Sequence, residues 1–262
     1  MRALGLACLM SITALPVHAQ GPQAMERDSW VGPINPGSTI RVDNPHGDVR
    51  LRHGGADPAL EVAAVLQQIA IDGSKLVLDV SVTDNEAVIS IVRLDHEGQP
   101  AHDVPRGDRA RADLALMIPE GFPVHAATTA GLLEVRGVRS DVDLSTVAGT
   151  IRVAETRGRI NARSDRGTVE ITLVTGATFG AQRLSTVTGP ITVFTAPTND
   201  LDVSMATSGS LTTDFSLDVV HVDHREPDKT ATATIGRGGH PLAMTSQRGD
   251  LALRRVVTVS TD

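Results

Sequence analysis

Apolar and polar residues alternate along most of this chain, which is the pattern of β-strands with one buried face. Near the N-terminus the alternation covers residues 40–42, 49–51 and 60–65. Residues 44–47 (Asn-Pro-His-Gly) predict a turn between the first two of these strands. The alternation therefore predicts β structure from about residue 38 onward.

A second group of strands follows. Residues 76–82 and 87–92 flank the polar segment 83–86, which predicts a β-hairpin with a short turn. The pattern lapses between residues 94 and 112, where Asp, His, Gly, Pro and Arg predict a long loop. Strand character returns at residues 113–118.

From residue 128 a short unit recurs: a Ser or Thr, two further residues, a Gly, and then alternating apolar positions. Clear copies begin at Thr128, Thr146, Ser164, Thr186 and Ser246, and a weaker copy begins at Ala206. A recurrence near 20 residues predicts a solenoid with one coil per repeat. We interpret the following glycines as structural corner residues: Gly47, Gly131, Gly149, Gly158, Gly167, Gly189, Gly209 and Gly249.

The residue types fit such a coil. Glycine turns the backbone at each corner, often through positive φ, and nearby Ser, Thr, Asn and Asp hydrogen-bond their own backbone. Val135, Ile151, Val169 and Ile191 are predicted to point inward and stack between coils. Residues 216–244 break the period, and we expect a protruding hairpin there, before a last coil that caps the stack.

The predicted fold is therefore all-β, a β-solenoid or β-roll of short stacked strands with an N-terminal hairpin region. We assign residues 38–118 to the hairpin region and 119–255 to the repeats, as one continuous domain. Residues 20–37, rich in Gly, Pro and polar residues, are interpreted as a leader arm.

These motifs together resemble the putative adhesin domain family of exported bacterial proteins. The resemblance covers roughly residues 38–255 and rests on 42–51, on 117–121, on the Thr/Ser-x-x-Gly repeats, and on 235–239 with 246–251. It implies a repetitive β domain of unknown biochemical function, and it brings no catalytic residues. Residues 94–112 depart from it, because they are longer and more charged than the family pattern.

The first nineteen residues resemble a secretory signal peptide. Arg2 precedes an apolar run that ends before Pro16, and small residues follow up to Ala19. The run is shorter than the roughly 20 residues that a permanent membrane helix needs. We therefore expect export, cleavage before Gln20, and a chain in the periplasm or at the cell surface without a membrane span. The only cysteine, Cys8, lies in this segment, so the exported chain is expected to lack disulfides and thiolate chemistry.

The composition narrows the classes of partner that this chain is expected to bind. The chain has 24 Lys and Arg against 31 Asp and Glu, for a net charge of -7, which argues against nucleic acid. It has four Phe, one Trp and no Tyr, so a deep sugar cleft or a compact aromatic hot spot is not expected. An extended, shallow and polar contact surface remains.

Candidate metal ligands have competing structural explanations. His221 and Asp223 share one face of a predicted strand, while His224 points to the other. We favour a solvated strand there over a metal site, which would need a further ligand. Asp141, Asp143 and Asp165 could form a carboxylate ladder that binds calcium, but the Gly-Gly-x-Gly-x-Asp run of calcium-binding rolls is missing, and exposed strand charge is favoured.

Other motifs carry no chemistry by themselves. Arg-Gly-Asp occurs at 106–108 and 248–250, but the second uses the corner Gly249, so coincidence is the preferred explanation. Signatures of serine hydrolases, zinc proteases and phosphate-binding loops do not occur. We expect no catalytic residues and no cofactor.

Two functions stay open. The first is a non-enzymatic scaffold of the envelope or cell surface that binds an envelope protein or polymer through an elongated polar surface. The second is a polysaccharide-active β-helix enzyme, a lyase or hydrolase, which would need acidic residues and a basic residue aligned in one groove.

Overall fold

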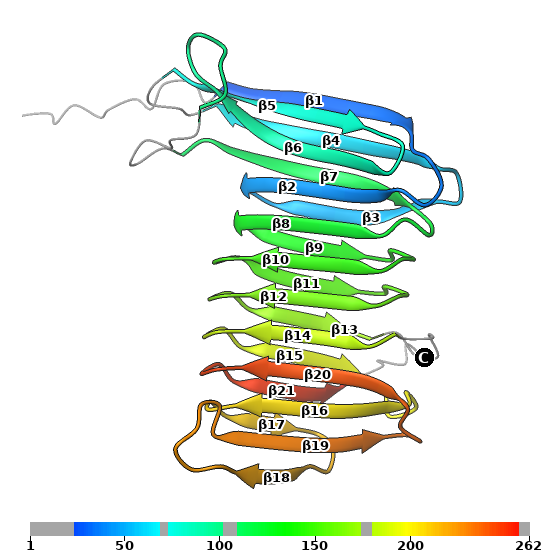
Figure 1. Cartoon of the computed structure of the whole chain (residues 1–262), viewed down its shortest axis with the longest axis vertical. Helices are drawn as coiled ribbons and strands as arrows, with labels where there is room; N and C mark the ends of the chain where they lie inside the picture. The colour runs from blue at the N-terminus through cyan, green and yellow to red at the C-terminus, as the bar shows by residue number, and fades with distance from the viewer. Residues whose placement is uncertain (1–23, 69–72, 102–108, 174–179, 257–262) are drawn as a thin grey trace, which may run out of the picture.

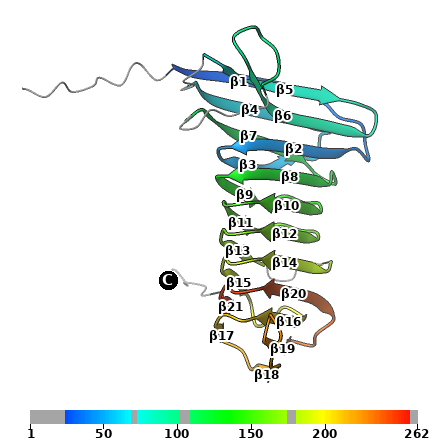
Figure 2. The same cartoon turned by 60° about the vertical axis from the view of Figure 1, so that its left-hand side comes forward.

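The structure, a computed structural model, describes residues 24–68, 73–101, 109–173 and 180–256, and the regular elements in these ranges are β-strands. The strands form two large mixed sheets that face one another (Figures 1 and 2). In spatial order, sheet A contains β1 (Ala24–Pro33), β4 (Ala59–Gln68), β7 (Arg111–Pro119), β3 (Val49–Gly55), β9 (Leu132–Arg136), β11 (Thr150–Ala154), β13 (Val169–Thr172), β15 (Ile191–Thr195), β21 (Leu251–Arg255) and β17 (Leu211–Thr213).

Sheet B has one strand more. In spatial order it contains β18 (Asp218–His221), β19 (Lys229–Ile235), β16 (Leu201–Thr207), β20 (His240–Ser246), β14 (Gln182–Thr186), β12 (Ile160–Ser164), β10 (Val142–Thr146), β8 (Val124–Ala130), β2 (Thr39–His46), β6 (Glu86–Leu94) and β5 (Lys75–Val82).

The chain passes from sheet B to sheet A in a repeated unit that we name a rung, defined as one strand of sheet B and the strand of sheet A that follows it. Both sheets keep the same spatial order of rungs: β2–β3, β8–β9, β10–β11, β12–β13, β14–β15, β20–β21 and β16–β17. Strands of neighbouring rungs run parallel and in register. The rungs form the vertical column of Figure 1, below the longer strands of the N-terminal region.

The core lies between the sheets and consists of aliphatic side chains stacked from rung to rung. In sheet A, Leu133, Ile151, Val169, Ile191 and Leu251 occupy one register position, and each is fully buried. Val135 is also buried, opposite Val153 of the next rung. The predicted inward orientation of Val135, Ile151, Val169 and Ile191 is confirmed.

A polar side chain interrupts the aliphatic stack of sheet B. Gln182 of β14 lies at the register position next to Ile160 of β12, and it is buried. Its side chain accepts a hydrogen bond from the Ile160 N–H at 2.7 Å and donates to the carbonyls of Gly158 and Gly180 at 3.1 Å. All of these side-chain hydrogen-bonding groups are used, so the buried amide costs little.

The repeat glycines lie above one another at one corner, in the order Gly47, Gly131, Gly149, Gly167, Gly189, Gly249 and Gly209. Each glycine after Gly47 lies against the glycine before it in this spatial order. A Cβ on any of these six glycines would overlap the carbonyl oxygen of that preceding glycine. Positive φ occurs only at Gly47 and Gly131 within this column. The expectation that positive φ selects these glycines is therefore wrong for most of them, because the close approach of the neighbouring rung excludes a side chain.

The Ser or Thr three residues before the glycine has a structural role. Ser164 Oγ accepts a hydrogen bond from the Gly167 N–H at 2.8 Å, and Thr146 Oγ1 accepts one from the Gly149 N–H at 2.9 Å. These hydroxyls belong to a second buried column of polar side chains, made of Asn44, Thr128, Thr146, Ser164, Thr186, Ser246 and Thr207. Ser246 accepts the same bond from the Gly249 N–H, so in these three copies the Thr/Ser-x-x-Gly motif is a local hydrogen bond that closes the corner.

The N-terminal region differs from its prediction in two ways. Strands β2 and β3 do not form a hairpin, because β2 lies in sheet B and β3 in sheet A, where each pairs in parallel with the repeats. The hairpin predicted for 76–82 and 87–92 is confirmed as β5 and β6. Within the expected leader arm, residues 24–33 form β1, which pairs with β4 along its full length.

The C-terminal region also differs. Strands β18 and β19 form the expected hairpin, but the last rung, β20–β21, does not cap the stack. It lies between rungs β14–β15 and β16–β17. The glycine spacing in the sequence does not reveal this insertion. Gly209 precedes Gly249 along the chain, but Gly249 comes before Gly209 in the spatial order of the stack.

Two sequence predictions fall outside the described residues: the signal segment 1–19 and the Arg-Gly-Asp at 106–108. Within the described ranges, no helix has the length and apolar character needed to cross a bilayer.

Candidate functional site

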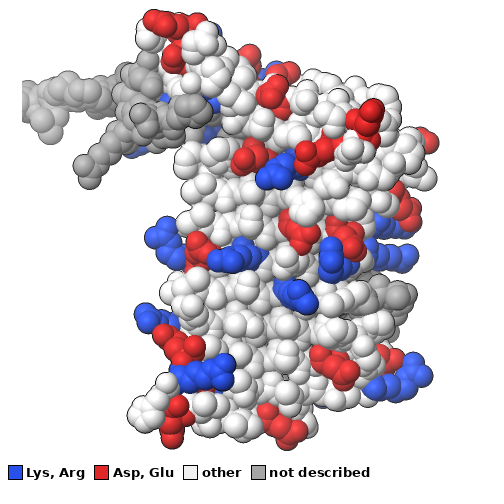
Figure 3. Space-filling model, in the orientation of Figure 1, with Lys and Arg blue, Asp and Glu red and all other residues white. Residues whose placement is uncertain are grey.

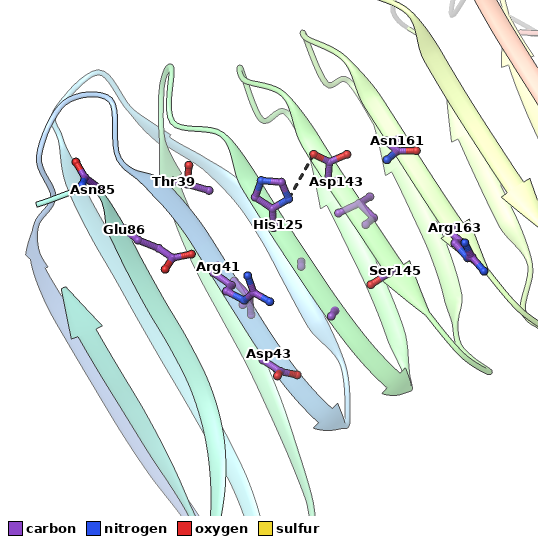
Figure 4. A pocket seen from close by; sticks show the side chains of 14 residues that line it. Thr39, Arg41, Asp43, Asn85, Glu86, His125, Asp143, Ser145, Asn161 and Arg163 are labelled. Carbon is purple, nitrogen blue, oxygen red and sulfur yellow. Dashed lines mark ion pairs between the residues drawn. The ribbon is translucent and has the colours of Figure 1, made fainter. Parts of the chain in front are cut away.

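A hollow of about 640 Å³ lies on the outer face of sheet B, over β6, β2, β8, β10 and β12 (Figure 4). We call it the sheet B hollow. Its polar lining comes from Thr39, Arg41, Asp43, Asn85, Glu86, His125, Asp143, Ser145, Asn161 and Arg163.

The hollow follows from side-chain size. Within one register position, Ala127 and Ser145 lie side by side between Asp43 on one flank and Arg163 on the other. Two small side chains between longer ones leave a depression, because outward side chains of neighbouring strands stand about 4.8 Å apart. A second hollow of about 330 Å³ shares Asp43, Ala127, Ser145 and Arg163 and continues toward the glycine corner.

A parallel row of polar side chains lies two residues earlier on each strand. It runs from Arg41 through His125, Asp143 and Asn161 to Arg183. His125 Nδ1 and Asp143 Oδ2 are 3.3 Å apart (dashed line in Figure 4), and their side chains are 51% and 27% exposed. The row thus presents cationic, anionic and amide groups to solvent in one line along the stack.

Several charged side chains of the hollow have no partner among the residues that the structure describes. Arg41, Asp43 and Glu86 form no ion pair or side-chain hydrogen bond with any residue that the structure describes. Figure 4 shows all three directed toward the open space. Both signs of charge are therefore available to a ligand.

The outer face of sheet A is different, because several of its charged side chains pair with one another across neighbouring strands. Arg52 bonds Glu134 at 2.6 Å, Arg50 lies 3.8 Å from the same carboxylate, and Arg152 lies 3.9 Å from Glu170. The hydrogen bond from Arg52 is the main cause that lowers the pKa of Glu134 below its ordinary value of 4.5. Figure 3 shows one face of the molecule, the one turned to the viewer in Figure 1, where acidic and basic groups lie in small mixed clusters.

The chemistry available in the sheet B hollow is that of ion pairs and hydrogen bonds. Two hydroxyls of the hollow, Thr39 and Ser145, lie near the His125–Asp143 pair (Figure 4), but Ser145 lies opposite Ala127 rather than His125, and Thr39 forms no side-chain hydrogen bond with a described residue. No hydrogen bond joins Ser145 to His125 in the described part of the chain. The geometry of an activated nucleophile, with base and hydroxyl in contact, is not present.

The carboxylate ladder, the less favoured interpretation of Asp141, Asp143 and Asp165, does not form. Asp143 lies between His125 and Asn161, whereas Asp141 accepts a hydrogen bond from the Arg159 N–H at 2.8 Å at the opposite corner. Asp165 lies beyond β12, 3.9 Å from Arg163. The three carboxylates are separated because different residue types occupy the same position on neighbouring rungs. This can be seen only once the strand register is known.

His221 and Asp223, the metal candidates, line a small hollow of about 370 Å³ with His224, Glu226 and Asp228. Among the described residues, no group of three or more His, Cys, Asp or Glu is placed to hold a metal ion.

The Arg-Gly-Asp at 248–250 is engaged within the chain. Arg248 bonds Glu226 at 2.6 Å, and Gly249 belongs to the glycine column. Hydrogen bonds from the Ser210 hydroxyl and N–H are the main causes that lower the pKa of Asp250. The tripeptide thus holds rungs β20–β21 and β16–β17 together.

Sequence reasoning missed the sheet B hollow. His125, Asp143 and Asn161 are 18 residues apart, the period of the repeat between Gly131, Gly149 and Gly167. Aligning the repeats by their glycines would have placed these three side chains in one row, but no property of each alone marks it as a site.

Comparison with known proteins gives structural neighbours only. No protein-family model matches the sequence, and no curated protein sequence matches it. The chain is similar to a solved structure of a putative cell adhesion protein from Clostridium sporogenes, at 12% identity and a TM-score of 0.43, over 88% of this chain and 100% of that one. It is also similar to a putative adhesin from Bacteroides fragilis, at 10% identity and a TM-score of 0.35, over 88% and 97%.

Proposed function

We propose that this chain is an exported, non-enzymatic scaffold of the cell envelope or surface, with adhesin-like binding of an extended polar ligand in the sheet B hollow. In this proposal the seven rungs are the coils of a β-solenoid, whose role is to hold outward side chains at fixed spacing. Residues 1–19 would direct export.

The observation that carries the proposal is the difference between the two outer faces. On sheet A, Arg52, Glu134, Arg152 and Glu170 pair among themselves. In the sheet B hollow, Arg41, Asp43 and Glu86 have no partner in the described part of the chain. A ligand that supplies partners to these groups would gain charge-assisted hydrogen bonds, which are roughly twice as strong as neutral ones.

The shape of the site indicates the kind of ligand. The row from Arg41 to Arg183 crosses five strands, so it spans roughly 19 Å at about 4.8 Å per strand. No Phe, Tyr or Trp is among the described residues that line the sheet B hollow, so recognition would depend on polar contacts rather than on stacking against large aromatic rings. An envelope polymer that carries both amino or amide groups and carboxylates fits this row.

The test measures binding of the purified chain to peptidoglycan sacculi, by cosedimentation, and to a panel of soluble bacterial surface polysaccharides. We expect at least one polymer to bind. The double variant Arg41→Ala with Asp143→Ala should weaken that binding by about ten-fold or more, because hydrogen bonds to charged groups contribute about 1.5–3 kcal/mol each.

The matched control is Arg152→Ala on the outer face of sheet A, which removes an exposed arginine without touching the sheet B hollow. The proposal fails if no polymer binds, or if the Arg152 variant weakens binding as much as the double variant. Release of new reducing ends from a bound polymer would instead favour the enzymatic alternative.

A further inference from the structure

The edge strands at the two ends of the stack differ in the features that hinder the addition of another strand. At the N-terminal end, β1 places Glu26 and Asp28 on the interior side of sheet A, opposite the buried Leu66 and Ala64. Inward charges on an edge strand oppose the addition of another strand.

On the neighbouring edge, β5, a side chain occupies the backbone groups of one residue near the start of the strand. Gln68 accepts a hydrogen bond from the Leu76 N–H and donates one to the Leu76 carbonyl, both at 2.8 Å. These two backbone groups are therefore unavailable to an added strand.

At the other end, β18 is the outermost strand of sheet B and pairs with β19 alone (Figures 1 and 2). Its central residues are exposed valines: Val219 is 46% and Val220 is 58% exposed. No side chain of the described residues bonds to the backbone of β18. This end thus combines an open edge with uncovered apolar surface.

The direction of the backbone groups fixes how a strand could be added. The Val222 N–H donates to the Asp228 carbonyl at 2.7 Å, which marks this pair as hydrogen-bonded in the β18–β19 ladder. Hydrogen-bonded and non-hydrogen-bonded pairs alternate in an antiparallel ladder. Val220 therefore directs its backbone groups at β19, whereas Val219 and His221 direct theirs at the free edge.

We propose that β18 pairs with β18 of a second copy of this chain, antiparallel and around a two-fold axis at Val220. Val219 then lies opposite His221 of the second copy, and His221 opposite its Val219. Each of these two pairs exchanges two backbone hydrogen bonds, and sheet B continues from one copy into the other.

A second copy is the partner because this edge complements itself. A two-fold interface joins the same patch on both subunits, and in this register Val220 faces Val220 as a non-hydrogen-bonded pair, where side chains lie closest. Asp218 lies opposite Val222 of the second copy, so no like charges oppose one another. Val220 of each copy would cover Val220 of the other, and Val219 would be covered by His221 of the second copy.

Cysteine cross-linking tests the register. The single native cysteine, Cys8, is first changed to Ser. The Cα atoms of a non-hydrogen-bonded antiparallel pair lie about 4.5 Å apart, within the range that a disulfide spans. Val220→Cys should therefore form a disulfide-linked dimer under mild oxidation, whereas Val82→Cys, an exposed valine on the opposite edge strand β5, should not. The proposal is overturned if Val220→Cys cross-links no more than Val82→Cys.

Sedimentation velocity tests the association itself. The full chain should form a dimer whose fraction rises with concentration. Val220→Lys, which places two like charges on the axis, should remain monomeric with an unchanged melting temperature, while Val82→Lys should still form the dimer. A monomeric wild-type chain at all concentrations, or an unchanged dimer for Val220→Lys, would contradict the proposal. Neither experiment depends on a ligand in the sheet B hollow.

Discussion

Substitution of Gly167 by alanine separates the two physical reasons for glycine at a rung corner. Gly167 does not have positive φ. If backbone conformation alone mattered, alanine would stabilise the chain by about 0.4–1 kcal/mol, because it restricts the unfolded state. The structure predicts the opposite sign.

The magnitude follows from the neighbouring rung. A Cβ on Gly167 would overlap the carbonyl oxygen of Gly149 and would lie 2.9 Å from Ser164 Oγ. The carbonyl belongs to the backbone of a paired rung, so it cannot move away by changing a rotamer. Overpacking of this kind costs about 1–3 kcal/mol, and occasionally more, so we expect a net loss of stability of that size.

The assay is urea unfolding followed by far-UV circular dichroism and by the fluorescence of Trp30, the single tryptophan. Gly180→Ala is the control, because a Cβ there meets only the side chain and Cα of Arg159, no closer than 3.3 Å. A Gly167→Ala chain as stable as wild type, or more stable, would refute the close-approach explanation.

Three further predictions concern the core, the corners and pH. The double variant Ile151→Asp with Val153→Asp should leave the repeat region unfolded, because both side chains are buried between the sheets and unpaired buried charge is costly; an unchanged melting temperature would contradict the assigned core. Ser164→Ala should lower the free energy of unfolding by about 1–3 kcal/mol, since it leaves the Gly167 N–H without its acceptor, and denaturant unfolding would measure this. The Glu134 carboxylate, whose pKa is lowered mainly by Arg52, should stabilise the fold above its ordinary pKa of 4.5, and this contribution should be lost as the pH falls below that value. Because the pair is partly exposed, Glu134→Gln should remove less than about 1 kcal/mol at neutral pH and flatten the pH dependence of stability below 4.5; an unaltered pH profile would contradict this.

The sequence predicts the interior well because burial leaves a periodic trace. Alternation identifies Ile151 and Val169 as inward, and the register confirms that they stack. The Thr/Ser-x-x-Gly motif marks corners because in several copies a hydroxyl and a glycine N–H, three residues apart, meet there. Such features are local, so a single sequence carries them.

Non-local features leave no such trace. The insertion of β20–β21 between rungs that are adjacent in sequence depends on which edges meet in space, and every rung carries the same local pattern. The sheet B hollow likewise depends on register, because Asp143 becomes a partner of His125 only when β8 and β10 pair. The sequence also does not reveal why glycine occupies the rung corners. A close approach between rungs and a positive φ both select glycine, so the residue type alone cannot distinguish them.

The order of the rungs is the claim on which the proposed surfaces depend, since it makes β18 the outermost strand. Disulfide formation in the Cys8→Ser background tests it directly. Ser185 and Thr245 lie opposite each other on β14 and β20, whereas Ser185 and Ala206 are separated by the intervening strand. Ser185→Cys with Thr245→Cys should cross-link within one chain, because neighbouring strands are about 4.8 Å apart. Cross-linking of Ser185→Cys with Ala206→Cys instead would show that the stack follows the order of the sequence and would contradict the structure.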